Sequence, residues 1–114
     1  MGMEGPFGQT PAPQEEVEIT REQVIESLRA TPGDFSLVRE FLNQREATFD
    51  KTKPVDLDYL QLDITQAEIY RDAGLINEAK EAFESNLMIA EQVAEKLGRV
   101  DLIEYCESEL AKLG

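Results

Sequence analysis

Acidic side chains are the residues of this sequence most able to do chemistry, because the chain has no histidine and a single cysteine. Asp56, Asp58 and Asp63 lie close enough in sequence to suggest a calcium loop. Such a loop needs glycine at its sixth position and a bidentate glutamate at its twelfth. Those positions hold Gln61 and Ala67. We therefore predict that the chain holds no metal, and no residue pattern indicates a cofactor.

Catalysis is equally poorly supported by the sequence. Without histidine, imidazole catalysis and histidine metal ligands are excluded. Cys106 lies on the apolar stripe of the last predicted helix, where a thiol is buried and inert. Glu104, Tyr105 and Glu107 fall at surface helix positions, and pairs of carboxylates occur by chance in so acidic a chain. We predict no catalytic residue and no enzymatic activity.

The charge balance excludes several classes of partner. The 114 residues include 24 acids and 11 bases, a net charge of −13. Direct nucleic-acid binding and docking on anionic lipid both need clustered Lys and Arg. No apolar run approaches the ~18 residues of a membrane span. The first residues lack the basic and apolar regions of a secretory signal. With a lone cysteine, this pattern predicts a cytoplasmic protein.

Two segments differ in composition. Residues 1–18 hold three glycines, three prolines, four acids and no base, which is typical of a disordered tail. Residues 19–114 follow a helical pattern throughout and are predicted to form one all-α domain. Helices are expected at about residues 20–30, 35–51, 56–73, 76–97 and 101–113. Their short connections favour antiparallel neighbours.

Local signals fix several of these helices. Thr20 and Gln23 form a capping box. Asp34 or Ser36 is expected to cap the second helix and Asp56 the third. Gly74 suits the residue after a helix end.

The third helix is the least certain at its start, where Val55, Leu57 and Tyr59 alternate with acids as in a strand. Further along, two apolar stripes appear on different sides of one helix. They predict a helix packed between neighbours. The residues of the stripes are Leu57, Leu60, Ile64 and Ala67, and Tyr59, Leu62, Ile69 and Ala73.

A weak internal repeat is visible at a shift of 41 residues, which pairs Gly33 with Gly74 and Val38 with Ala79. The second unit resembles a tetratricopeptide repeat of the long-helix type, best over residues 57–98. Asn86 and Glu91 depart from the pattern of that family. The residues that carry the resemblance are Ala67, Tyr70, Gly74, Ala79 and Phe83.

The resemblance implies a short antiparallel array of helical hairpins, an α-solenoid or bundle, that binds proteins or peptides. In this family the first helix of each pair lines the binding face. A clamp for peptide C-termini needs several bases there, and only Arg71 is suitable, so that role is rejected. The residues that the resemblance places on the face are Gln61, Ile64, Glu68, Arg71 and Asp72.

The excess charge is uneven and leaves two interpretations open. Residues 21–53 are neutral, whereas residues 54–114 hold fourteen acids and five bases, a net charge of −9. This half is either a solvated surface or an acidic face for a basic partner. The leading prediction is a non-enzymatic adaptor for a protein or peptide. The alternative is an acidic inhibitor that mimics nucleic-acid charge and blocks a basic nucleic-acid-binding protein.

So short an array also leaves one end without a neighbour. We therefore expect the protein to self-associate as a homo-oligomer or to dock an end face on its partner.

Overall fold

The computed structural model describes residues 18–114, which form five α-helices and no strand. The predicted all-α class is therefore confirmed. All but the last residue of the predicted tail, 1–18, lies outside the described residues. The helices are α1 (Arg21–Ala30), α2 (Ser36–Glu46), α3 (Asp56–Asp72), α4 (Ile76–Val93) and α5 (Val100–Leu113).

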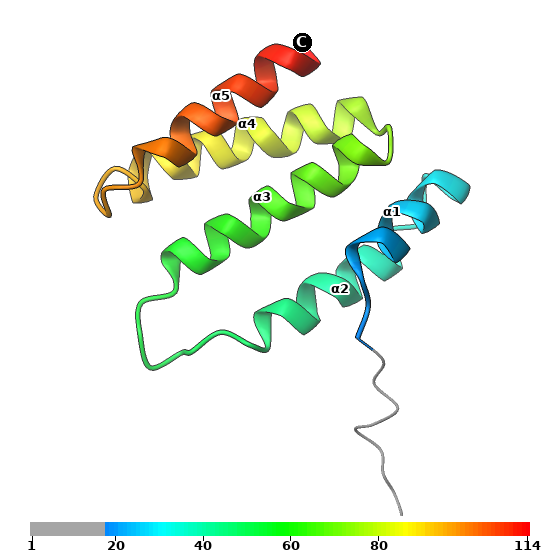
Figure 1. Cartoon of the computed structure of the whole chain (residues 1–114), viewed down its shortest axis with the longest axis horizontal. Helices are drawn as coiled ribbons and strands as arrows, with labels where there is room; N and C mark the ends of the chain where they lie inside the picture. The colour runs from blue at the N-terminus through cyan, green and yellow to red at the C-terminus, as the bar shows by residue number, and fades with distance from the viewer. Residues whose placement is uncertain (1–17) are drawn as a thin grey trace, which may run out of the picture.

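Helix α3 is the centre of the fold (Figure 1). It packs against α1 and α2 on one side and against α4 on the other, and α5 packs on α4. The strand-like alternation around Val55 and Leu57 does not form a strand, because α3 begins at Asp56. The predicted helix between neighbours is confirmed.

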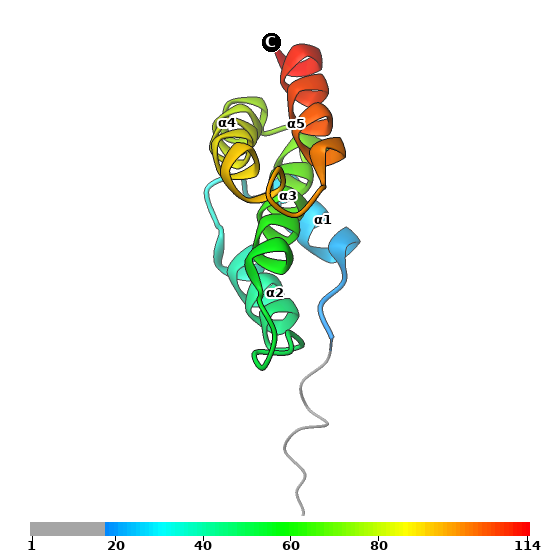
Figure 2. The same ribbon diagram turned by 90° about the vertical axis from the view of Figure 1, so that its left-hand side faces the viewer.

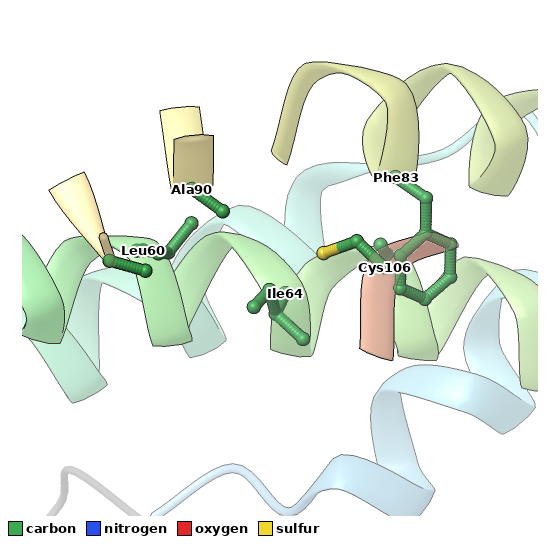
Figure 3. Close-up of a cluster of buried hydrophobic side chains, with 7 residues drawn as sticks. Leu60, Ile64, Phe83, Ala90 and Cys106 are labelled. Atoms are coloured by element: carbon green, nitrogen blue, oxygen red, sulfur yellow. The ribbon is translucent and has the colours of Figure 1, made fainter. Parts of the chain in front are cut away.

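Two hydrophobic clusters meet at α3, and each takes one of its apolar stripes. The larger one joins α3, α4 and α5. Leu60 lies beside Ala90 at one end, the ring of Phe83 lies beside Cys106 at the other, and Ile64 lies between them (Figure 3). The other joins α1, α2 and α3. Its buried members are Val24, Leu28, Val38, Phe41, Ile69 and Ala73. A helix that serves two cores cannot leave either group of its neighbours without exposing an apolar stripe.

The predicted capping box is confirmed. The amide of Gln23 donates to the hydroxyl of Thr20 at 3.2 Å, and the amide of Thr20 donates to Oε1 of Gln23 at 2.9 Å. Both bonds satisfy amides at the start of α1 that have no partner within the helix.

Glycine ends α3 as expected. Gly74 has a φ of 86°, and the amide of Leu75 then reaches the carbonyl of Tyr70 at 2.9 Å. Only glycine adopts this left-handed conformation without strain. The sharp turn brings α4 back alongside α3.

Two helix ends and two caps were predicted wrongly. Helix α2 ends at Glu46, not residue 51, because Thr48 turns back and its hydroxyl donates to the carbonyl of Arg45 at 2.7 Å. Helix α4 ends at Val93, not residue 97, and turns follow it as far as Gly98. The cap of α2 is Phe35 rather than Asp34 or Ser36, although the amide of Ser36 donates to Oδ1 of Asp34 at 3.1 Å. Asp56 is the first residue of α3 rather than its cap, which is Val55.

No helix in the part of the chain described here is long and apolar enough to cross a membrane. Several large apolar side chains nevertheless remain at the surface of α4, with Met88 65% and Ile89 38% exposed.

Candidate functional site on the two sides of helix α3

Helix α3 has two polar sides that face different neighbours. Seen along the molecule, α1 and α5 lie on one side of α3, whereas α4 and the start of α2 lie on the other (Figure 2). We call these the α1/α5 side and the α2/α4 side. Three of the five residues predicted to bind a partner, Glu68, Arg71 and Asp72, belong to the α1/α5 side. The α2/α4 side carries an open groove.

Arg71 forms the central ion pairs of the α1/α5 side. Its Nε contacts Oδ1 of Asp72 at 2.9 Å, and one terminal nitrogen contacts Oε1 of Glu109 on α5 at 2.7 Å. Glu109 is only 5% exposed, and its second oxygen accepts from Lys112 at 3.1 Å. The bonds from Asp72 and Glu109 raise the pKa of the guanidinium of Arg71. These ion pairs join α3 to α5.

A second arginine joins α1 to the same group. Arg21 contacts Oε1 of Glu68 at 3.0 Å and Oδ2 of Asp72 at 3.2 Å. Arg29 donates to the backbone carbonyl of Asp72 at 2.7 Å. Burial alone would raise the pKa of Asp72, but its bonds to Arg71 and Arg21 outweigh burial and lower that pKa. Asp72 is therefore held as a carboxylate by two cations.

Tyr105 completes this network from α5. Its hydroxyl donates to Oε2 of Glu68 in a short hydrogen bond and accepts one from Arg71 at 3.4 Å. Burial, reinforced by the bond to Glu68, raises the pKa of Tyr105 to about 12, so the phenol stays protonated at neutral pH. We call this set the ion-pair cluster. Its members are Arg21, Glu68, Arg71, Asp72, Tyr105 and Glu109.

The five residues predicted to face a partner have different surroundings. Glu68, Arg71 and Asp72 come together, but they are bonded to α1 and α5. Ile64 is a correction, since it is 6% exposed and lies in the core between α3, α4 and α5. Gln61 alone is exposed, at a shallow hollow beside Arg45 and Leu62.

Sequence reasoning missed the partners of these residues. Glu109 was not considered and Tyr105 was placed at the surface. A signal was present, because Leu102, Cys106, Glu109 and Leu113 follow the four–three–four spacing of a buried stripe. An acid at a core position of such a stripe needs a cationic partner.

The groove on the α2/α4 side has a volume of about 480 Å³ and is open to solvent. We call it the α3/α4 groove. One wall is a stripe of α3, the other is a stripe of α4, and the start of α2 closes one end. Its lining residues are Phe35, Asp63, Gln66, Tyr70, Glu78, Glu81, Ala82, Ser85, Asn86 and Ile89.

Aromatic contacts fix one end of the groove. The rings of Phe35 and Tyr70 meet edge to face with centroids 5.8 Å apart. Gln66 donates to the hydroxyl of Tyr70 at 2.7 Å. These bonds hold both rings in place, so this end is a preformed apolar surface.

Asp63 sits in the other part of the groove and has no such support. No side chain in residues 18–114 forms an ion pair or hydrogen bond with its carboxylate. Burial raises the pKa of Asp63 above its ordinary value. Asn86 lies beside it at 3% exposure, but donates to the backbone carbonyl of Asp63, at 3.1 Å. Asp63 is thus a half-buried charge without a counterion in the described chain.

Two further candidates for chemistry remain, the thiol of Cys106 and a group of side chains that could hold a metal ion. Cys106 is buried, as predicted, and burial raises the pKa of its thiol to about 11. Within residues 18–114, no three acidic or cysteine side chains gather in a way that could hold a metal ion.

Comparisons with protein-family models, curated proteins and solved structures found no match to this chain.

Proposed function

We propose that this protein is a non-enzymatic adaptor that binds a segment of another protein in the α3/α4 groove. The observation that carries the proposal is the groove itself. It combines fixed aromatic rings, the partly exposed side chain of Ile89 and the unpaired carboxylate of Asp63. Binding sites commonly join an apolar surface to a few polar groups that orient the ligand.

The order of helix packing supports a tetratricopeptide-like stack. Helices α1 and α2 precede α3, which packs on both of them, and α4 returns beside α3 before α5 packs on α4. We interpret α1/α2 and α3/α4 as two hairpins and α5 as the first helix of an incomplete third. A stack of this kind offers grooves along its sides rather than an enclosed pocket.

The groove replaces the binding face first inferred from the resemblance. A partner on the α1/α5 side would compete with Arg21, Tyr105 and Glu109 for the same polar atoms of α3. Binding there would break bonds that hold helices together. Binding in the groove need not break any of these bonds, because no side chain in residues 18–114 bonds to the carboxylate of Asp63.

Site-specific photocrosslinking in extract of the native cells tests this function. A photoreactive residue replaces Ser85, which lines the groove, or Ser108, another exposed serine, on α5. We expect one protein to be crosslinked from position 85 and not from position 108. Crosslinking of one protein from position 108 alone, or of none from position 85, contradicts the proposal.

The acids of α4 support charge mimicry as a second candidate function. Glu84 and Glu91 of α4, and Glu95 just beyond its end, are exposed and have no ion pair within the described residues. A protein that mimics nucleic-acid charge should lose affinity for its basic target steeply as salt rises. A groove complex should lose affinity less steeply, because part of its contact surface is apolar and does not weaken with salt.

A further inference from the structure

We propose that the occupant of the α3/α4 groove is a basic segment of another protein, with a Lys or Arg side chain on Asp63 and apolar side chains on Ile89 and Tyr70. This inference rests on the proposed function and gives the partner its chemistry. The groove lining includes three acids and no base.

Charge complementarity comes first from Asp63. The acids of the ion-pair cluster each have a cationic or phenolic partner, and Asp63 has none in the part of the chain that is described. The other titratable groups on the groove walls are Tyr70, Glu78 and Glu81. The two glutamates repel a second anion, so a cation is the ligand that this wall favours.

The apolar side chains of the groove lie along its length, on either side of Asp63. Because Asn86 bonds to the carbonyl of Asp63, this part of α4 lies opposite Asp63, and Ile89 is one turn further on. Tyr70 is seven residues beyond Asp63 on α3, about 10 Å along the axis. A segment on the groove therefore meets an acid and an apolar surface together at each end. It should alternate basic and apolar side chains.

Other occupants of the groove bring the wrong charge. Residues 1–18 of this chain hold four acids and no base, and a second copy of the chain carries a net charge of −13. Both would place further acids beside Asp63 and the two glutamates. A separate, basic protein is the occupant that satisfies the groove.

A defined peptide probe tests the chemistry. The probe is a fluorescent peptide of about twelve residues, repeating Leu-Lys-Lys-Leu, a length that as a helix covers the stripe from Glu78 to Ile89. Its counterpart carries Glu in place of Lys. Anisotropy with the full chain at physiological salt should show binding of the lysine peptide and none of the glutamate peptide.

Matched variants locate the binding. The double variant D63N/E81Q removes two charges from the groove, and E104Q/E107Q removes two from exposed positions of α5. We expect about a tenfold loss of affinity for D63N/E81Q and less than about twofold for E104Q/E107Q. I89A should weaken binding about threefold, whereas M88A, its exposed neighbour, should not. An equal loss in both charge variants, or binding of both peptides, overturns the inference.

The peptide and crosslinking experiments distinguish failure of the basic-partner inference from failure of the adaptor function. If position 85 crosslinks a partner but D63N/E81Q leaves the affinity for the lysine peptide unchanged, the adaptor function stands and the basic partner is rejected. If the lysine peptide binds through Asp63 but position 85 crosslinks no protein, the chemistry of the groove stands and the adaptor function is rejected.

Discussion

Asp72 and Asp63 lie on one helix and have opposite surroundings. Asp72 accepts from Arg21 and Arg71, and those bonds outweigh burial and lower its pKa. Asp63 lies on the α2/α4 side without a partner among the described residues, and burial raises its pKa. One carboxylate is stabilised by the fold and the other is slightly destabilised by it.

The contrast shows how the negative charge is divided. Acids of the ion-pair cluster hold α1 and α5 against α3, so they belong to the structure. Asp63 contributes nothing of this kind, and a charge kept at a cost to stability is typical of binding sites. The net charge of −9 in residues 54–114 is therefore neither uniformly structural nor uniformly free.

Removing Arg71 from the ion-pair cluster should have the largest effect. R71A leaves the carboxylate of Glu109, 5% exposed, with Lys112 as its remaining cation. Loss of one partner from a mostly buried pair should lower the free energy of unfolding by about 2 kcal/mol. Denaturant melts measure it, and faster modification of the buried Cys106 thiol should report loosening of α5.

The control for this variant is R99A. Arg99 pairs with Asp101 at 3.1 Å, but Asp101 is exposed and Arg99 is only partly buried. An exposed pair contributes about 0.5 kcal/mol or less. If R71A and R99A change stability equally, the ion-pair cluster does not hold α5 as described.

Removal of Arg21 should have a smaller, local effect. R21A breaks the bonds to Glu68 and Asp72, but Arg21 is one-third exposed, so the loss should be about 1 kcal/mol. Amide exchange should accelerate in α1 and not in α4. Uniform acceleration through both helices would show that α1 does not respond separately.

Acid should weaken the cluster in a defined direction. Burial would raise the pKa of Glu109, but bonds from Arg71 and Lys112 outweigh it and lower that pKa, as for Asp72. Their contribution is present above their ordinary pKa values of 4.5 and 3.8 and is lost as pH falls below them. D72N/E109Q should therefore lose less stability than the wild type on acidification. Parallel melting curves across this range would contradict the assignment.

The smallest effect on stability is expected for Asp63. A carboxyl whose pKa is raised by burial destabilises the folded state above that pKa, so D63N should leave stability unchanged or raise it by less than about 1 kcal/mol. Thermal melts at neutral pH measure it. A clear loss of stability would mean that the carboxylate of Asp63 has a structural partner.

Sequence patterns predicted the helices well because local chemistry determines them. The Thr20–Gln23 capping box and the glycine turn at Gly74 depend on neighbouring residues. The two apolar stripes of α3 could be predicted from the spacing of apolar residues alone. Helix α2 was predicted too long because Phe49 fits its apolar spacing, whereas in the fold Phe49 packs edge to face on Tyr59 beyond the helix end.

The candidate site was harder to predict, because it depends on which helices meet. Spacing along α3 placed Glu68 and Asp72 on one side, but nothing local shows that Arg21 arrives from 47 residues away in sequence. The groove likewise needs the register of α3 against α4. In the sequence Asp63 belonged to a calcium-loop pattern that was rejected, and only its lack of a side-chain partner among residues 18–114 distinguishes it.

Comparison of D63N with D72N tests the division of labour on α3 most directly. Each variant changes one carboxylate of the same helix to its amide, and both stability and affinity for the lysine peptide are measured. We predict that D63N keeps its stability and loses affinity several-fold, whereas D72N loses about 1 kcal/mol of stability and keeps its affinity. If both variants change the same property, or if D72N loses affinity and D63N loses stability, the two sides of α3 do not have the roles assigned to them.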